Sequence, residues 1–217
     1  MSKRIKVLVS LVTIFVLIFT FTFNSYAGSI SVDDFNLWQS GTTKAYKIGS
    51  SGICVPVGGT EVIPNYVGAQ QIRSQTTHGF QWYGCFKGGS NAPDGAQEMA
   101  VFICDDVTNW TGREMGFLKT LNDNVIKAYL QGPGGVFKYA VVLTNDNGYH
   151  TFKAVVRDES HPDTVDYYVD GVYKCTLTNP GVNYWKRNYY FVGTTHRTVG
   201  GWNSTGYQIE MYNMQTF

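Results

Sequence analysis

Residues 149–177, which read YHTFKAVVRDESHPDTVDYYVDGVYKCTL, restrict the fold of this chain more than any other stretch. Residues 152–157 and 165–169 are mostly β-branched or aromatic, a composition that suits a pleated strand and disfavours a helix. Asp170-Gly171 then precedes a further strand at residues 172–177, and such a pair is a two-residue hairpin signal because both positions must accept positive φ. Asn147-Gly148 gives a similar signal between residues 139–144 and 149–156. These turns predict three or four consecutive antiparallel strands.

The remainder of the chain repeats this pattern of short strands and turns. Residues 158–163 hold charges and Pro162, which cannot donate to a ladder, so an exposed turn is expected there. Further strands are expected at residues 32–38, 45–48, 53–57, 70–75, 80–86, 98–104, 114–118, 125–130 and 207–214, and residues 119–124 are compatible with a short helical turn. With 24 glycines and no apolar stripe of helical period, the sequence predicts an all-β fold, a two-sheet antiparallel β-sandwich.

The first 27 residues have the pattern of a signal peptide. Lys3, Arg4 and Lys6 precede an uncharged apolar run at residues 7–23, and small residues follow it at Ser25 and Ala27. We therefore expect residues 1–27 to be removed and residues 28–217 to form one secreted, extracellular domain. The alternative is an uncleaved anchor, since the run approaches the roughly 20 residues that span a bilayer.

The charge balance argues against nucleic acid as a partner. The full chain has a net charge of +1, and removal of the basic leader leaves the rest slightly acidic. No contact with a membrane is expected after the leader is removed.

The four cysteines, Cys54, Cys85, Cys104 and Cys175, all lie after the leader, and an even number in an exported chain favours disulfides. We expect at least one bridge, and all three pairings remain open. The spacings do not match a zinc site. Oxygen ligands at residues 145–147 could suit structural calcium, but a turn explains them, so no metal or other cofactor is assigned.

The order of these elements resembles the concanavalin A-like superfamily of legume-lectin, laminin-G-like (LamG) and β-glucanase domains. The resemblance is carried by QIRS at 71–74 leading into WYGCF at 82–86, by YHTF at 149–152 leading into YVDG at 168–171, and by YQIEM at 207–211. It spans nearly all of residues 30–217. It implies a jelly roll of two curved antiparallel sheets with a concave face, and we expect a ligand to bind on that face or at the loop ends.

Retaining β-glucanases of this superfamily carry Glu-x-Asp-x-Glu or Glu-x-Asp-x-x-Glu on one concave strand, and retention needs two carboxyls about 5–5.5 Å apart. The comparable strand here reads REMGFLKT at 113–120. Glu114 matches the nucleophile, but Gly116 replaces the Asp, and Leu118 or Lys119 replaces the acid. The resemblance therefore implies an incomplete catalytic motif. Glu98 with Asp105 and Asp106, or Glu210, could still pair with Glu114 across a sheet. No other nucleophile motif is present.

The 15 tyrosines and 5 tryptophans exceed what a core requires, and such rings suit sugar faces as well as protein interfaces. We therefore predict a lectin-like domain that binds a glycan or cell-surface polymer and has no catalytic activity. The expected ligand-binding residues are Trp82, Trp110, Arg113, Glu114, His196, Arg197 and Trp202. One alternative is a glycoside hydrolase or polysaccharide lyase that uses Glu114. Another is a structural surface module whose rings contact proteins.

Overall fold

The computed structural model describes residues 28–39, 43–57, 65–90, 92, 98–108, 112–197 and 204–217. The expected signal peptide at residues 1–27 lies outside these ranges, so the boundary after residue 27 stays a prediction. Among the residues described, no helix is long and apolar enough to span a membrane.

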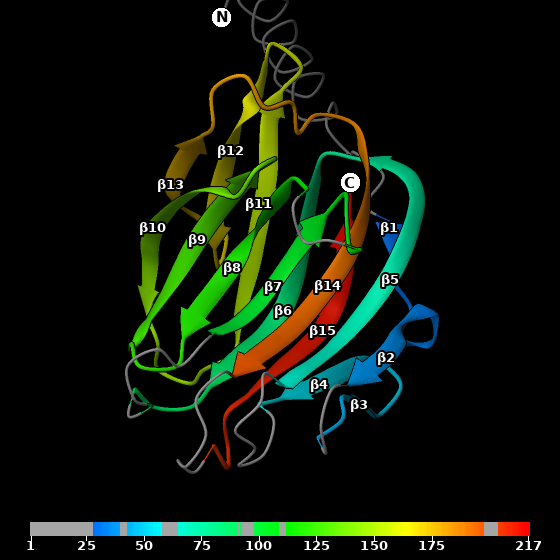
Figure 1. Cartoon of the computed structure of the whole chain (residues 1–217), viewed down its shortest axis with the longest axis vertical. Coiled ribbons are helices and arrows are strands. Elements are labelled where there is room, and N and C mark those ends of the chain that lie inside the picture. Colours follow the sequence, from blue (N-terminus) through cyan, green and yellow to red (C-terminus); the bar gives the residue numbers. More distant parts are fainter. Residues whose placement is uncertain are drawn as a thin grey trace, which may run out of the picture.

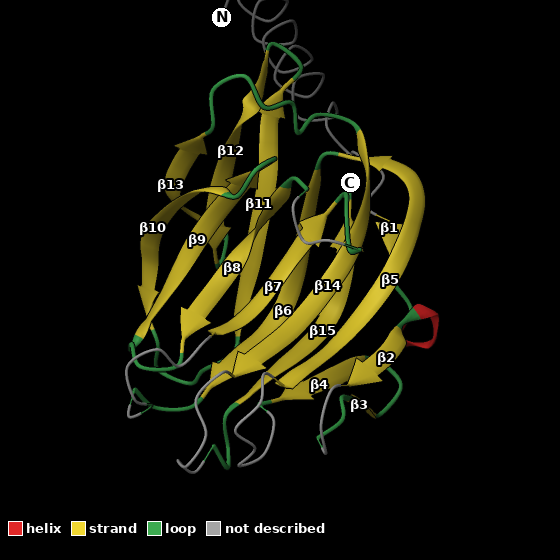
Figure 2. Cartoon of the chain, viewed as in Figure 1, coloured by secondary structure: helices red, strands yellow, loops and turns green. Residues whose placement is uncertain are grey.

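The chain forms two antiparallel sheets packed face to face (Figures 1 and 2). The eight-stranded sheet A has the order β13-β12-β11-β6-β15-β4-β3, with β1 paired to β15. Its strands are β1 (Gly28–Ser29), β3 (Tyr46–Ile48), β4 (Gly52–Pro56), β6 (Gly79–Lys87), β11 (His150–Asp158), β12 (His161–Val169), β13 (Val172–Thr178) and β15 (Gln208–Thr216).

The seven-stranded sheet B has the order β10-β9-β8-β7-β14-β5-β2. Its strands are β2 (Asn36–Gln39), β5 (Asn65–Thr77), β7 (Glu98–Cys104), β8 (Glu114–Thr120), β9 (Val125–Gly132), β10 (Val136–Thr144) and β14 (Arg187–Arg197). The only helical element in the described ranges is the 3-10 turn η1 (Val32–Asp34). The prediction of an all-β, two-sheet antiparallel sandwich is therefore confirmed.

Aromatic side chains fill the space between the sheets. Trp82 on β6 stacks on Phe152 of β11 with ring centroids 4.6 Å apart, and Phe117 of β8 lies 5.1 Å from Phe152 across the sandwich. All three side chains are fully buried. The expectation that Trp82 binds ligand is therefore wrong, because alternation along β6 turns its ring into the core.

The Asp170-Gly171 turn joins β12 to β13 as expected. Both residues have positive φ, 52° and 75°, which is the type I′ geometry of a two-residue hairpin. The Asp170 carboxylate accepts hydrogen bonds from the backbone N–H of Thr151 at 2.9 Å and pairs with Nδ1 of His150 at 2.7 Å. The consecutive antiparallel strands β11, β12 and β13 are thus confirmed.

The hairpin predicted at Asn147-Gly148 is not formed. Asn147 does adopt a positive φ of 61°, but the strands on either side belong to different sheets, β10 to sheet B and β11 to sheet A. The Asn147 side-chain oxygen accepts a hydrogen bond from the backbone N–H of Gly88 at 2.8 Å, which fastens this crossover to the end of β6.

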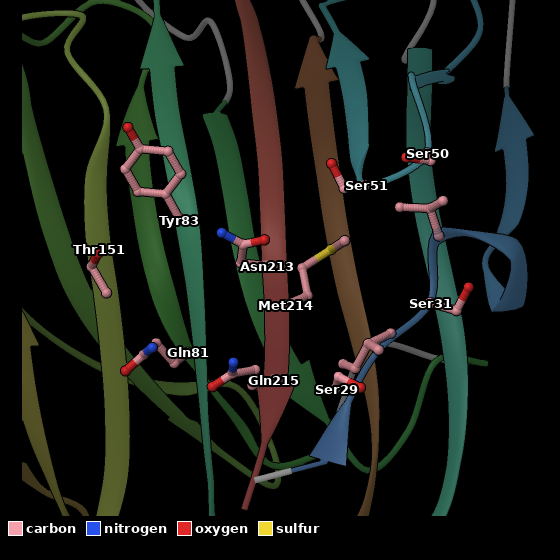
Figure 3. Close-up of a pocket in the computed structure, with 12 residues that line it drawn as sticks. Ser29, Ser31, Ser50, Ser51, Gln81, Tyr83, Thr151, Asn213, Met214 and Gln215 are labelled. Carbon is pink, nitrogen blue, oxygen red and sulfur yellow. The ribbon is translucent and has the colours of Figure 1, made fainter.

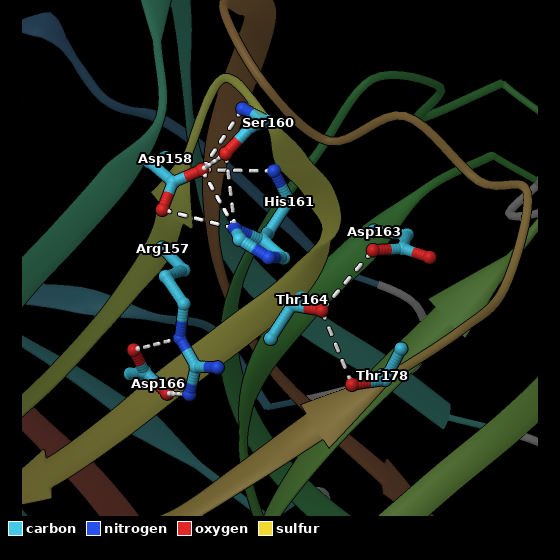
Figure 4. Close-up of polar contacts among 8 residues, drawn as sticks. All are labelled: Arg157, Asp158, Ser160, His161, Asp163, Thr164, Asp166 and Thr178. Carbon is cyan, nitrogen blue, oxygen red and sulfur yellow. Dashed lines mark hydrogen bonds and ion pairs between the residues drawn. The ribbon is translucent and has the colours of Figure 1, made fainter.

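The turn between β11 and β12 is tighter than expected (Figure 4). The Asp158 carboxylate accepts hydrogen bonds from the backbone N–H groups of Ser160 and His161, both at 2.8 Å. Hydrogen bonds from the side chains of Ser160 and His161 lower the pKa of Asp158 to about 2. Pro162 lies within β12, beside the register shift between Val156 and Asp158, where a missing N–H costs no ladder bond.

Two other segments differ from the predictions. Strand β14 was not expected, because glycine and threonines interrupt its apolar pattern, yet it is central to sheet B between β7 and β5. The strand expected at residues 32–38 divides into η1 and β2, because Ser31 caps the 3-10 turn by accepting from the Asp33 N–H at 3.2 Å. Residues 119–124 end β8 and form a turn rather than a helix.

The expected disulfide is absent, since all four cysteines are free thiols. Cys54 on β4 and Cys85 on β6 both align with Glu210 of β15, which lies between them. Two strand spacings, about 10 Å, therefore separate their backbones, which exceeds the roughly 7 Å that a disulfide tolerates. Cys104 and Cys175 lie on different sheets, on β7 and β13.

We predict that denatured protein, prepared without reductant, releases four thiol equivalents in a titration with an aromatic disulfide reagent. In the native state Cys175 should react first, because it is the only one of the four that is not fully buried. A Cys175→Ser variant should lose this first reaction, whereas Cys85→Ser should retain it. Fewer than four thiols in denaturant would show a bridge and contradict the structure.

Candidate functional site

The face of sheet B that points away from the core, here called the outer face of sheet B, carries the residues that the sequence marked. Along β8, Met115 and Phe117 point into the core. Glu114, Gly116 and Leu118 alternate with them and therefore share the outer face. Leu118 joins a second apolar cluster on this face, made of Ala100, Phe102, Cys104, Leu118, Tyr129 and Val192.

A cavity of about 150 Å³ is set into this outer face. It is lined by Glu98, Phe102, Glu114, Tyr129, Gln131, Phe137, Thr194 and His196. Five adjacent strands, from β10 to β14, supply these side chains. A second hollow of about 310 Å³ adjoins it, shares Glu98 and Phe137, and continues to Lys127 and Tyr139. Together the two hollows form what we call the sheet B groove.

Glu114 is nearly enclosed in this groove, with 6% of its surface exposed. Burial raises the pKa of Glu114 to about 8, although the Tyr129 hydroxyl donates a hydrogen bond to its Oε2 at 3.3 Å. The negative charge of Glu98 adds to the effect, and burial also raises the pKa of Glu98. Glu114 therefore holds a proton at neutral pH and can donate a hydrogen bond to a ligand.

Gly116 explains why the aspartate of the glucanase motif is missing. A Cβ atom at this position would lie 2.4 Å from Cβ of Phe102 and 2.6 Å from the carbonyl oxygen of Val101. Strands β7 and β8 thus approach too closely here for any side chain. The packing of the sheet therefore leaves no room for an aspartate at this position.

The two positions expected for the catalytic acid of the glucanase motif hold residues that stabilise the fold. Leu118 lies in the apolar cluster, and Lys119 points inward and is fully buried. The Lys119 ammonium donates hydrogen bonds to the carbonyl oxygens of Gly89 at 2.7 Å, Asp123 at 2.8 Å and Thr120 at 3.3 Å. Burial lowers the pKa of Lys119 to about 8. This side chain joins the segment after β6 to the turn between β8 and β9.

Glu98 is the second carboxyl group of the groove, but its backbone lies far from that of Glu114. Glu98 pairs with Thr120, six positions beyond Glu114 on β8. At about 3.3 Å per residue this is about 20 Å along the strand, compared with about 13 Å for the first and last residues of Glu-x-Asp-x-Glu. The two acids share one groove without the spacing of a retaining pair.

Exposed rings form one wall of the groove. Phe137 is 47% exposed and stacks on Tyr129, with centroids 5.7 Å apart and planes inclined by 26°. Tyr139 is 67% exposed, and the Lys127 ammonium lies 5.8 Å from its ring centre. A flat apolar surface therefore lies beside the carboxyl and amide groups.

Of the residues expected to bind ligand, Glu114 and His196 come together in the groove, and burial lowers the pKa of His196. Arg113 points elsewhere, because its guanidinium pairs with Asp105 at 2.9 Å and its N–H donates to the same carboxylate. The backbone of Arg197 ends β14, but its side chain lies outside the described part of the structure. Trp110 and Trp202 also lie outside it.

The sequence did not point to Tyr129, Gln131, Phe137 or Thr194 as ligand-binding residues. Tyr129 and Gln131 stand two positions apart on β9, and Phe137 pairs with Gln131 across the hairpin to β10. The alternation of side chains along a strand could have placed Tyr129 and Gln131 on one face of the sheet. Only the register between β8 and β9 shows that they lie beside Glu114. Among the described residues no group of three or more His, Cys, Asp or Glu side chains could hold a metal ion.

We predict that Glu114→Gln removes the loss of folding stability that wild-type protein suffers as pH rises. Between about pH 4.5 and pH 8 the folded protein keeps a proton on Glu114 that the unfolded chain releases, so wild-type stability falls as pH rises. The free energy of unfolding of the variant should match wild type near pH 5 and exceed it by a few kcal/mol near pH 9. Denaturant unfolding across this range measures it. Glu159→Gln, in an exposed turn, is the control, and a constant difference between Glu114→Gln and wild type would refute the assignment.

We also predict that Gly116→Ala destabilises the fold by about 1–3 kcal/mol, because the added methyl group overlaps Phe102 and the Val101 carbonyl. Thr120→Ala, at the end of the same strand, should have a smaller effect. Chemical denaturation monitored by tryptophan fluorescence gives both values. A Gly116→Ala variant as stable as wild type would show that the strands can separate.

No family model and no curated protein matches this sequence. Solved structures do share its fold. An endo-1,3-beta-glucanase from Streptomyces sioyaensis has a TM-score of 0.57 and 11% identity, covering 87% of this chain and 90% of the other. The Emp47p carbohydrate recognition domain has a TM-score of 0.57 and 15% identity, covering 85% and 88%. A Bacteroides ovatus mixed linkage glucan GH16 protein has 0.51 and 14%, covering 79% and 83%. The chain therefore has the concanavalin A-like jelly-roll fold.

Proposed function

We propose that this chain is a carbohydrate-binding domain whose ligand occupies the sheet B groove. The observation that carries the proposal is the exposed face of Phe137 beside the carboxyl group of Glu114 and the amide of Gln131 in one cavity. A pyranose ring has an apolar C–H face and hydroxyl groups at its edge, so a ring wall with neutral donors and acceptors beside it is complementary to a sugar.

Binding without cleavage is favoured over catalysis. The close approach of strands at Gly116 leaves no room for the middle aspartate. At the two positions expected for the second acid, Leu118 packs in the apolar cluster and the Lys119 ammonium binds loop carbonyl groups. The fold itself supports either activity, since the similar structures include two glucan-acting proteins and a carbohydrate recognition domain.

A glycan-cleaving enzyme is the second candidate, because Glu98 and Glu114 line one cavity and burial raises the pKa of both. Such a pair is a common signature of acid and base groups. The long separation of the two backbones suits the wider carboxyl spacing of an inverting enzyme, about 6.5–9.5 Å, better than that of a retaining one.

We further propose that the domain acts outside the cell on a glycan or cell-surface polymer. The proposal rests on the basic and apolar pattern of residues 1–27 and the small residues that end it.

We predict that a glycan array identifies ligands for the protein and that Phe137→Ala and Gln131→Ala weaken their binding about tenfold or more, through loss of stacking and of one amide. The control is Tyr173→Ala, which removes a 54% exposed ring from the other sheet. Equal binding by wild type and both groove variants would exclude the groove as the site.

Reducing-end release from bound glycans separates the two candidates. Wild-type protein should bind the glycans without releasing any reducing ends. Release that is abolished by Glu114→Gln and, separately, by Glu98→Gln would instead establish the enzyme, while binding alone would establish the lectin-like domain.

A further inference from the structure

A second and larger cavity lies on the outer face of sheet A, on the opposite side of the sandwich from Glu114. Figure 3 shows the residues that line it. Its volume is about 510 Å³. Strands β6, β11 and β15 form its floor, and the segment around β1 and the turn before β4 form its wall. It is therefore separate from the sheet B groove.

The floor carries a row of amide and hydroxyl groups. Gln81 on β6 and Gln215 on β15 are register partners, and Thr151 on β11 pairs with Tyr83. Directly opposite residues have Cβ atoms about 4.5–5.5 Å apart, so the two glutamine amides lie side by side. Within the described part of the chain, the side chains of Gln81, Asn213 and Gln215 form no hydrogen bond, which leaves their donors and acceptors to a ligand.

A β-bulge turns Asn213 into this cavity. The register of β15 shifts between Tyr212 and Gln215, and Asn213 adopts a φ of 48°, a left-handed conformation that asparagine tolerates better than most residues with a side chain. As a result Met214 enters the core with 1% exposure, while Asn213 faces solvent beside Gln215. Bulges of this kind commonly aim a side chain at a binding site.

Tyrosine rings extend the cavity at one end. Ser51, Tyr83 and Asn213 also line an adjoining hollow of about 300 Å³, together with Tyr149 and Tyr212. Tyr83 and Tyr149 stack with centroids 5.7 Å apart, and each is about two-fifths exposed, at 41% and 40%. The two hollows therefore form one trough, with rings at one end and amides at the other.

Partly buried polar contacts hold the Tyr149 ring in place. The Tyr149 hydroxyl donates to the carboxylate of Glu210, which also accepts from the Lys87 ammonium at 2.5 Å. The Lys87 ammonium lies 5.5 Å from the centre of the Tyr149 ring. A platform fixed in this way loses little entropy when a ligand stacks on it.

The described residues that line the trough carry no charge. Among them there is no carboxylate, ammonium, guanidinium or imidazole group. Neutral amides, hydroxyls and phenol rings suit uncharged hydroxyl groups, whereas a sulfated or uronic acid sugar would lack a counter-charge. We propose that the trough on sheet A is a second carbohydrate site, which binds an uncharged oligosaccharide of several sugars and acts independently of the sheet B groove.

The test uses the Phe137→Ala variant as background, so that binding in the sheet B groove is weakened first. Calorimetric titrations with cellohexaose, laminarihexaose, mannohexaose and xylohexaose supply neutral probes, and hexagalacturonate supplies a charged one. At least one neutral hexasaccharide should bind the background protein, and Tyr83→Ala or Gln81→Ala added to it should weaken binding about tenfold or more. Tyr173→Ala, on the same sheet but outside the trough, is the control, and thermal melts check folding.

Absence of binding by all four neutral probes in the Phe137→Ala background would overturn the proposal. Binding that persists in both Tyr83→Ala and Gln81→Ala, or tighter binding of hexagalacturonate than of any neutral probe, would do so as well. Because the groove is impaired throughout, failure here leaves the function proposed for sheet B standing. Conversely, loss of sheet B binding would not affect the trough.

Discussion

The packing of rings between the two sheets is the interaction on which the rest of this molecule depends. Trp82, Phe117 and Phe152 are fully buried and meet across the sandwich, so each of β6, β8 and β11 has one fixed inward face. A slip of one residue in any of these strands would expose a large ring and bury polar groups, which is energetically prohibitive. The residues that alternate with these rings along the strands therefore point away from the core. Both proposed binding surfaces depend on this arrangement.

Much of the architecture could be read from the sequence where local signals are decisive. The Asp170-Gly171 turn requires two positive φ values, and the structure has them. Strand β7 has the predicted bounds because its apolar run ends in the turn at Asp105-Asp106. The hairpin prediction at Asn147-Gly148 was wrong because the residues of a turn determine the bend of the chain but not which sheet the next strand joins. Strand β14 escaped notice because contacts with β5 and β7, rather than its own composition, make it a strand.

The sites were less predictable than the fold. The place of Glu114 on the outer face follows from alternation along its strand, but the groove around it depends on register across five strands, which no local pattern encodes. Alternation of apolar and polar residues predicts Asn213 on the same face as Ile209 and Met211, and the bulge reverses this. Trp82 misled for the opposite reason, since an aromatic residue next to glycine and tyrosine gives no sign of whether its ring is in the core or on a surface.

The hydrogen bonds of Lys119 limit the substitutions that this part of the sheet tolerates. Its ammonium occupies the centre of three carbonyl groups, next to the position where a glucanase would keep its acid, while β7 and β8 close over Gly116. Introducing acids at these positions one at a time would give poorly folded variants, since each change breaks a stabilising contact or forces strands apart. A carboxylate pair of the glucanase type therefore could not be built into this strand by single substitutions without a loss of stability.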